Sequence, residues 1–480
     1  MKKTFKEIFI LLFILFMSAN LSAQDIDPGV EAAKKGDYVK AVNLLKNAVN
    51  GDDSYEGYYY YGLSLMNTGS MKEAEANLQK ALKKDDEGIG ALTAMGNLYS
   101  RKKEYDKADT YFKKALKEEP ENMDVLLAQA KNYTVGGKID EAITVLTFAT
   151  TIDSKNPNVY VGLGDAYYFR RAFKPSIDNY KQALSLQSSN ANAHYGLGKV
   201  YFRQKDYNDA LTEFKQSVQL NPNFADGYLE LGRLLYFNEN YGEALEAFEK
   251  YDKLQPGSVD GQTYIAKVLY GQRKYDEALT KLQSIISENP DADLSSAYKY
   301  TAYVYNDKDE YDKALEYFNK VPKNLYETED YIQLAKIYVK KKDYNSAYNS
   351  FNDAIAADST DDVIFYEMGV AQFSEKEYEK AIVNFDRSIE LGSKQLAAYV
   401  YKGLCYYSLQ KYEDAIAAFD IVNNLDNAYF QSWLWKARSE EALERIDDAI
   451  ASIKRAIEID PDNASAKEDL LRLEQKKQQQ

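Results

Sequence analysis

The chain has almost none of the side chains from which redox and metal sites are commonly built. Its 480 residues include one cysteine, Cys405, and one histidine, His194. A single cysteine excludes any disulfide within the chain. A single histidine leaves histidine-based triads and histidine-cluster metal sites without their residues. We therefore expect a protein that is not an enzyme and that holds no metal ion and no cofactor.

Basic residues are too few to balance the acidic ones. Lysine and arginine together number 60 against 75 aspartates and glutamates, which gives a net charge of −15 at pH 7. A chain this acidic repels phosphate backbones. The composition therefore argues against nucleic acid as a partner.

Long hydrophobic runs are absent except for one near the start of the chain. Lys2, Lys3 and Lys6 precede the apolar run 8–17, and small or polar residues follow as far as Ala23. A charged start, an apolar middle and a small-residue end are typical of a secretory signal peptide. We expect residues 1–23 to be this signal and to be removed after Ala23. The run is short for a membrane span, and an uncleaved membrane anchor is the alternative.

Export would place the protein in the periplasm or cell envelope of a diderm bacterium. No other stretch of the sequence approaches a membrane span. No cysteine lies near residue 20, where bacterial lipid attachment usually takes place. After cleavage we expect a soluble protein with no stable membrane insertion.

The sequence is rich in tyrosine, with 43 residues, and it repeats itself from end to end. An alanine, which ends a Tyr-x-x-Ala phrase in most repeats, returns every 33–36 residues, with serine replacing it once. The aligned positions are Ala41, Ala74, Ala108, Ala142, Ser176, Ala210, Ala244, Ala278, Ala314, Ala347, Ala381, Ala415 and Ala449. A regular period of this length indicates a repeat solenoid.

Each repeat carries the same apolar pattern around this anchor residue. In the sixth repeat, Tyr207 precedes Ala210 by three residues and Phe214 follows it by four, while Leu197 and Gly198 mark the first half. Spacings of three and four place such residues on one helical face. Each repeat therefore predicts two helices packed against each other.

This pattern resembles the tetratricopeptide repeat (TPR) family, whose unit of about 34 residues carries a Trp, Leu-Gly, Tyr, Ala, Phe and Pro signature. The resemblance covers residues from about 25 to 463, with prolines near the ends of several repeats at Pro120, Pro222, Pro256 and Pro461. It implies an all-α fold, a right-handed α-α superhelix (TPR solenoid) of about thirteen repeats.

Two segments depart from the regular repeat. The period lengthens and then shortens around residues 290–328, where Pro322 interrupts a second helix. This predicts a change of superhelix pitch, or alternatively a long loop followed by a short helix. Residues 464–477 continue the amphipathic pattern and predict a capping helix. The predicted organisation is a signal peptide (1–23), a tandem TPR array (24–463), and a capping helix with a disordered tail (464–480).

The resemblance also implies where a partner binds. In this family the first helices line a concave groove, and positions 2, 5, 9, 12 and 13 of each repeat face it. The fifth to eighth repeats supply Tyr168, Phe169, Tyr195, Lys199, Phe202, Arg203, Arg233, Tyr236, Phe237, Lys267 and Tyr270 at these positions. Three of these residues, Lys199, Arg233 and Lys267, lie one repeat apart and are called the basic ladder below.

Two interpretations of these groove residues stay open. Aromatic residues and arginine are enriched at interface centres, and a row of bases suits carboxylates. The first interpretation is therefore a protein or peptide partner with an acidic segment. The second is that the aromatic residues pack between neighbouring repeats while the bases form salt bridges with nearby acids.

The remaining chemically suggestive residues have structural explanations. His194 occupies a position that holds tyrosine or tryptophan in several other repeats, and Cys405 lies among apolar neighbours. The fragment Gly162-Leu163-Gly164 lacks the third glycine and the preceding strand of a dinucleotide loop. Because the repeats occupy nearly all of the chain after residue 23, no room remains for a separate catalytic domain.

The sequence therefore favours an exported TPR scaffold or adaptor that mediates protein–protein interactions. Its predicted role is in the assembly of a cell-envelope, secretion or polysaccharide-export machine. The alternative is a carbohydrate- or peptidoglycan-binding module, because a tyrosine-rich groove also suits sugars.

Overall fold

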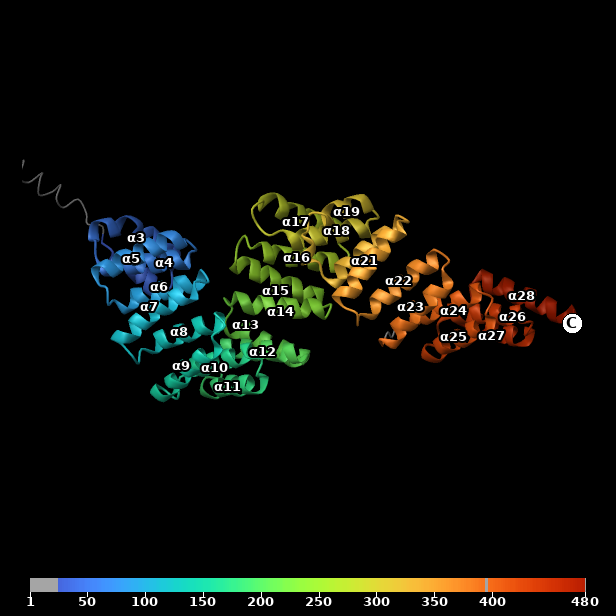
Figure 1. Cartoon of the computed structure of the whole chain (residues 1–480), viewed down its shortest axis with the longest axis horizontal. Coiled ribbons are helices and arrows are strands. Elements are labelled where there is room, and N and C mark those ends of the chain that lie inside the picture. The colour runs from blue at the N-terminus through green and yellow to red at the C-terminus, as the bar shows by residue number, and fades with distance from the viewer. Residues whose placement is uncertain (1–24, 393–395, 480) are drawn as a thin grey trace, which may run out of the picture. The chain divides into compact units, whose positions relative to one another are not determined.

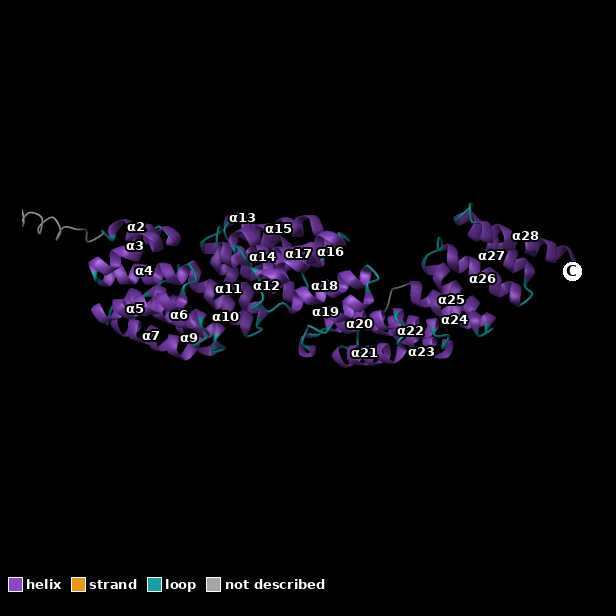
Figure 2. Ribbon diagram, turned by 90° about the horizontal axis from the view of Figure 1, so that it is seen from above, coloured by secondary structure: helices purple, strands orange, loops and turns teal. Residues whose placement is uncertain are grey.

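The computed structural model describes residues 25–392 and 396–479, and within these ranges every regular element is a helix. The chain divides into two compact units, one ending at Pro256 and the other beginning at Gly257. Figure 1 labels the helices in chain order, and Figure 2 shows them joined by short loops. The signal peptide predicted for residues 1–23 lies outside the described residues.

The first unit holds seven helix pairs. Their bounds are α2 (Asp27–Lys34), α3 (Tyr38–Asp52), α4 (Tyr55–Asn67), α5 (Met71–Lys84), α6 (Ile89–Arg101), α7 (Tyr105–Glu118), α8 (Met123–Val135), α9 (Ile139–Ile152), α10 (Pro157–Phe169), α11 (Phe173–Leu186), α12 (Ala191–Gln204), α13 (Tyr207–Leu220), α14 (Ala225–Phe237) and α15 (Tyr241–Leu254).

The second unit holds six helix pairs, one 3₁₀ turn and a final single helix. Their bounds are α16 (Val259–Gly271), α17 (Tyr275–Glu288), α18 (Ser295–Asp307), α19 (Tyr311–Phe318), η1 (Lys323–Leu325), α20 (Thr328–Lys340), α21 (Tyr344–Ala357), α22 (Asp362–Ser374), α23 (Tyr378–Glu390), α24 (Leu396–Ser408), α25 (Tyr412–Leu425), α26 (Phe430–Ala442), α27 (Ile446–Ile459) and α28 (Ala464–Gln479).

Consecutive helices pack against each other within each unit. First helices of neighbouring repeats also touch directly, as α10 does with α8 and with α12. One face of each unit is therefore built from first helices. The predicted all-α solenoid of thirteen helix pairs with a final helix is confirmed.

The anchor residue of every repeat lies in the core. All twelve anchor alanines and Ser176 are fully buried, and so is the large apolar residue four positions later, such as Phe214 or Phe385. The small residue of the first helix faces this side chain. A Cβ added at Gly198 would lie 2.6 Å from the ring of Phe214. At this contact the close approach of α12 and α13 therefore leaves no room for a Cβ on residue 198.

The turn inside each repeat has one fixed backbone conformation. The residue five positions before the anchor has a positive φ in every repeat: Gly36, Gly69, Lys103, Gly137, Arg171, Lys205, Glu239, Arg273, Asp309, Lys342, Lys376, Gln410 and Glu444. The left-handed region reverses the chain after the first helix. Only three of these residues are glycine. In the other ten repeats the residue type therefore does not predict a left-handed turn.

Asparagine side chains start three first helices of the first unit. The side chains of Asn122, Asn156 and Asn190 accept hydrogen bonds from backbone N–H groups at the beginning of α8, α10 and α12. This satisfies donors that have no partner inside the helix. The three caps hold the helices that line the candidate site.

The ninth repeat is shortened and is tied to the tenth by a buried polar network. Helix α19 ends at Phe318, four residues before Pro322. Asp330 is 1% exposed, and its carboxylate accepts from the Lys299 ammonium at 2.5 Å and from the Tyr303 hydroxyl at 2.5 Å. Lys299 also donates to the Leu325 carbonyl at 2.6 Å. The change of pitch at 290–328 stays a prediction.

Helix α28 covers the end of the second unit. Ala466 and Leu473 are buried in the cluster formed with α26 and α27. Two ion pairs fix the helix on its neighbours, Arg438–Asp469 at 2.9 Å and Arg472–Glu441 at 2.7 Å. The helix runs to Gln479, two residues beyond the end expected from the sequence. Among the described residues no helix is long and apolar enough to span a membrane.

Candidate functional site

A cleft of about 450 Å³ opens on the first-helix face of the first unit. Helix α8 contributes Leu127, Lys131 and Val135, α10 contributes Val161, Asp165 and Phe169, and α12 contributes Tyr195 and Lys199. These side chains occupy positions 5, 9 and 13 of their repeats. The cleft therefore lies among the positions that the sequence assigned to the groove.

Lys199 lines the cleft and is held on three sides. Its ammonium is 3.4 Å from Asp165 Oδ1, 5.0 Å from the centroid of the Tyr168 ring and 4.8 Å from that of Tyr195. A cation over two aromatic faces is stabilised by their negative potential. The side chain is only 20% exposed. Lys199 is thus an ordered part of the cleft wall.

Asp165 is in turn held from the core beneath it. The hydroxyl of Tyr180, a fully buried residue of α11, donates to Asp165 Oδ1 at 2.7 Å. Burial, together with the charge of Asp165, raises the pKa of Tyr180 well above its ordinary value. The hydroxyl therefore stays protonated and keeps donating to the carboxylate.

The basic ladder does not form one uniform row of available bases. Arg233 is paired with Glu230, one turn earlier on α14, at 3.0 Å. Arg203 donates from Nε to the Tyr168 hydroxyl at 3.3 Å. Lys267 belongs to the second unit, where it lies 4.7 and 4.9 Å from the ring centroids of Tyr264 and Tyr300. Lys199 and Arg233 thus have acids of this chain beside them.

Most of the predicted groove aromatics pack within their own repeats. Four of them contact the aromatic residue that begins the following helix, with ring centroids 5.6–6.4 Å apart: Tyr168 with Phe173, Phe202 with Tyr207, Tyr236 with Tyr241, and Tyr270 with Tyr275. Phe169 and Phe237 differ, because they are 52% and 59% exposed. The cleft brings together Phe169, Tyr195 and Lys199, with Tyr168 beside them. Tyr270 belongs to the second unit, like Lys267.

Three charged residues of the cleft were missed by the sequence reasoning. Lys131 and Asp165 occupy the ladder position in the fourth and fifth repeats, and Asp226 contributes from the start of α14. Extending the ladder register backwards by two repeats would have found the first two. That extension also shows an acid, Asp165, within the row of bases.

Comparison with known protein families identifies the repeat. Models described as TPR repeat or tetratricopeptide repeat match residues 90–122, 130–168, 173–205, 198–238, 225–258, 265–325 and 331–361. A model described as anaphase-promoting complex, cyclosome, subunit 3 matches residues 374–456. The chain belongs to the tetratricopeptide repeat family. Its TPR array is a scaffold for interaction with proteins or peptides, a fold that typically carries no catalytic activity.

Solved structures with similar folds are numerous. The chain is similar to the APC/C hetero-tetramer Cut9-Hcn1, with 15% identity over 95% of this chain and 98% of that chain, and a TM-score of 0.47. It is similar to yeast Tom70, with 16% identity over 88% and 96% and a TM-score of 0.37. It is also similar to YrrB, described as a TPR protein with an unusual peptide-binding site, with 24% identity over 38% and 94% and a TM-score of 0.30. No curated protein matches the sequence.

Elsewhere in the TPR array, the residues that suggested chemistry have structural roles. The His194 ring lies 2.5 Å from Glu213, and this hydrogen bond raises the pKa of the imidazole. Burial raises the pKa of the Cys405 thiol to about 12. Within the described ranges, histidine, cysteine and acidic side chains form no cluster of three that could hold a metal ion.

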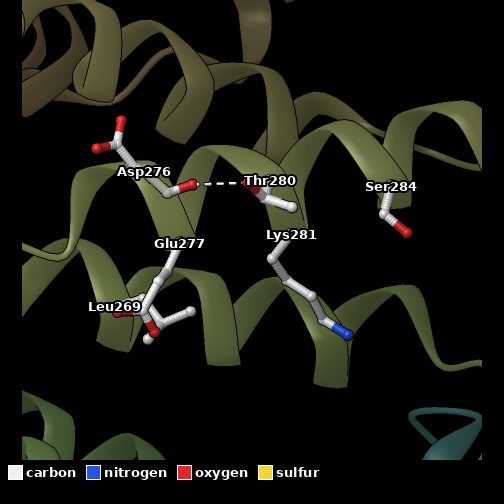
Figure 3. Close-up of a pocket in the computed structure, with 6 residues that line it drawn as sticks. All are labelled: Leu269, Asp276, Glu277, Thr280, Lys281 and Ser284. Atoms are coloured by element: carbon white, nitrogen blue, oxygen red, sulfur yellow. Dashed lines mark hydrogen bonds between the residues drawn. The ribbon is translucent and has the colours of Figure 1, made fainter.

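A second depression lies on the second unit and is shown in Figure 3. Asp276, Glu277, Thr280, Lys281 and Ser284 of α17 line it together with Leu269 of α16. The Thr280 hydroxyl donates to the Asp276 backbone carbonyl at 2.8 Å, as serine and threonine do inside helices. Because five of the six residues project from a single helix, this is a shallow helix surface, and the cleft on the first unit is the better candidate site.

Proposed function

We propose that this TPR array is an exported adaptor that binds a segment of a partner protein in the cleft of its first unit. The assembly that it serves would be a secretion, polysaccharide-export or other cell-envelope machine. The observation that carries the proposal is the cleft itself, to which three consecutive first helices contribute apolar and charged side chains. The charged start and apolar run before Ala23 support export.

The exposed apolar side chains support a protein partner. Phe169 and Val135 are 52% and 43% exposed, and both line the cleft. Covering such side chains removes apolar surface from water, which contributes about 25 cal/mol per Å² before the costs of association. Phe237, in the seventh repeat, offers a further exposed ring outside the cleft.

The positions of the bases support acidic side chains in the partner segment. Lys131 and Arg203 are exposed and form no ion pair with any described residue. Arg233 has its carboxylate partner on an exposed helix face, where such a pair contributes about 0–1 kcal/mol. A carboxylate of the partner can therefore replace Glu230 at little cost.

The glycan-binding alternative has less support. Stacking on a sugar ring needs an open aromatic face. The Lys199 ammonium lies over a face of Tyr195, which lines the cleft, and over a face of Tyr168 beside it. We therefore favour the protein partner.

The test compares charge reversal on the two sides of the repeats. One variant carries Lys131→Glu, Lys199→Glu and Arg233→Glu, all on first helices of the first unit. The matched control carries Lys83→Glu, Lys181→Glu and Lys250→Glu, which change the same charge at exposed positions on second helices. A partner captured from envelope extract is purified, and its affinity for each variant is measured by calorimetry.

We expect the groove variant to bind at least about tenfold more weakly, since it removes charge-assisted contacts. The control should bind like the wild type, and circular dichroism should be unchanged for both. Equal affinity of the two variants would show that the partner uses another surface.

A further inference from the structure

The cleft is lined by as many acidic as basic side chains. Lys131 and Lys199 are basic, whereas Asp165 and Asp226 are acidic. A purely acidic segment would therefore meet as many acids as bases. The cleft has the charge pattern of a site for a segment that itself carries both signs.

One carboxylate oxygen of Asp165 accepts no hydrogen bond from the residues that the structure describes. Both of its contacts, from the Tyr180 hydroxyl at 2.7 Å and from the Lys199 ammonium at 3.4 Å, go to Oδ1. No described residue donates to Oδ2, and the side chain is 38% exposed. A carboxylate oxygen in this state accepts readily from a cationic side chain.

Tyr180 and Asp165 occur together and only once in the array. Tyr180 occupies the core position that holds leucine, isoleucine or phenylalanine in every other repeat, such as Phe214 in the next one. Asp165 is the only acid at the ladder position of the thirteen repeats. A hydroxyl in this core needs an acceptor, because an unpaired buried polar group is costly. The same bond fixes the orientation of the Asp165 carboxylate.

We propose that Asp165, positioned by Tyr180, makes the cleft select a peptide segment of mixed charge, which places a basic side chain on Asp165 and an acidic side chain on Lys131. This inference rests on the proposed function, since it takes the cleft as the binding site. Packed helices lie about 8–10 Å apart, and α8 and α10 are in contact. An extended peptide rises about 3.3 Å per residue. The two charges of the segment are therefore about three residues apart, with an apolar side chain between them against Leu127 and Val161.

Asp165 also disfavours the binding of a segment that carries only acidic side chains. A segment with acids at both positions would bring a carboxylate against Asp165 in a partly enclosed cleft, where repulsion between like charges is strong. Specificity often depends on such an unfavourable contact as much as on the favourable one. Asp165 is thus the specificity-determining residue, and Tyr180 is its positioning residue.

The experiment uses a random dodecapeptide library displayed on phage and selected against the full chain. The readout is the enrichment of Lys/Arg and Asp/Glu at each spacing, followed by fluorescence anisotropy with the consensus peptide. The variants are Asp165→Asn, Lys131→Gln and Tyr180→Phe. The control is Glu246→Gln, an exposed residue of α15 outside the cleft.

The wild type should enrich a base and an acid about three residues apart. Asp165→Asn should lose the enrichment of the base and bind the consensus peptide about tenfold more weakly. Lys131→Gln should lose the enrichment of the acid. Tyr180→Phe should fold normally, because phenylalanine fills this core position in neighbouring repeats, and should still reduce the preference for the base. A purely structural tyrosine would leave that preference unchanged.

Two outcomes would overturn the inference in different ways. Enrichment of acids alone, unchanged by Asp165→Asn, would refute the mixed-charge segment and leave the proposed function standing. No enrichment, or peptides whose binding ignores all three cleft variants, would refute both.

Discussion

A glycine in the first helix and a large side chain in the second determine how closely the two helices of a repeat approach. Gly198 leaves no room for a methyl group beside the Phe214 ring. In the fourth repeat, Ala130 occupies the same position and its large counterpart is Leu146. The tenth repeat combines Ala335 with Phe351, so each repeat accommodates its own pair. Tight core packing makes each such contact sensitive to side-chain volume.

The contact between Gly198 and Phe214 can be tested with a double-mutant cycle. Gly198→Ala gains about 1 kcal/mol of helix propensity but overpacks the ring contact at a cost of about 1–3 kcal/mol. We expect a net loss of stability of up to about 2 kcal/mol. Phe214→Leu alone should also destabilise, by leaving a small cavity. The double variant reproduces the pairing of the fourth repeat and should lose less than the sum of the two, as measured by urea unfolding. Strictly additive losses would contradict the packing argument.

His194 is the only histidine of the chain, so the titration of its imidazole can be followed without overlap from another histidine. Its hydrogen bond to Glu213 raises the pKa of the imidazole above its ordinary 6.5, against the opposing effect of burial. The folded pKa is the higher one, so the bond stabilises the fold fully below pH 6.5. That stability is lost as the pH rises through the folded pKa.

The measurement is an NMR titration of the single imidazole. The wild type should titrate above 6.5, and the pKa of the imidazole should be lower in Glu213→Gln, since the carboxylate that raises it is gone while burial still lowers it. A wild-type value at or below 6.5 would show that the Glu213 bond is not formed in solution.

At the scale of the element, the turn between the two helices of a repeat depends on backbone conformation more than on sequence. Gly137 adopts φ +79° in the fourth repeat, and Lys205 adopts φ +67° at the same position in the sixth. A side chain in the left-handed region costs roughly 1–2 kcal/mol, which glycine avoids. In ten of the thirteen repeats a residue other than glycine adopts this conformation. Packing of the flanking helices must therefore impose the turn.

Exchanging the residue at this position should shift stability in opposite directions. Lys205→Gly should stabilise the protein by about 0.5–1 kcal/mol, because the relief of strain exceeds the added entropy of the unfolded chain. Gly137→Ala should destabilise it by about 1–2 kcal/mol. Both are followed by thermal and urea unfolding. If both substitutions proved neutral, the left-handed turn would not exist in solution.

For the whole molecule, the sequence predicted the parts of the fold that depend on period. The anchor positions, the helix pairs and the capping helix all follow from apolar spacing, which packing preserves in every repeat. The left-handed turns could not be predicted, because Lys103 or Glu239 there has no distinctive chemistry. The division at Pro256 was also missed, since Pro222 ends its repeat in the same way without a boundary.

The candidate site was predicted only in part, for a similar physical reason. Register placed Tyr195, Lys199 and Phe169 on the first-helix face, where the cleft lies. It could not show that Tyr168 contacts Lys199 and Phe173 together, or that Tyr180 reaches Asp165 from the core. Such contacts join residues of different helices. Their formation depends on side-chain length and direction, which the period of the repeat does not determine.

Export would determine where in or outside the cell the whole molecule is found. The charged start, the apolar run 8–17 and Ala23 predict export with removal of residues 1–23. The first described helix, α2, begins at Asp27, so this cleavage would leave every described helix intact. N-terminal sequencing of protein from its own cells should therefore give Gln24, and fractionation should recover it outside the cytoplasm. Leu12→Arg places a charge in the apolar run, where insertion costs about 3 kcal/mol, and should leave Met1 in place and the protein inside the cell. An intact Met1 on the wild-type protein in the cytosolic fraction would refute export, whereas an intact Met1 in the membrane fraction would favour the uncleaved anchor.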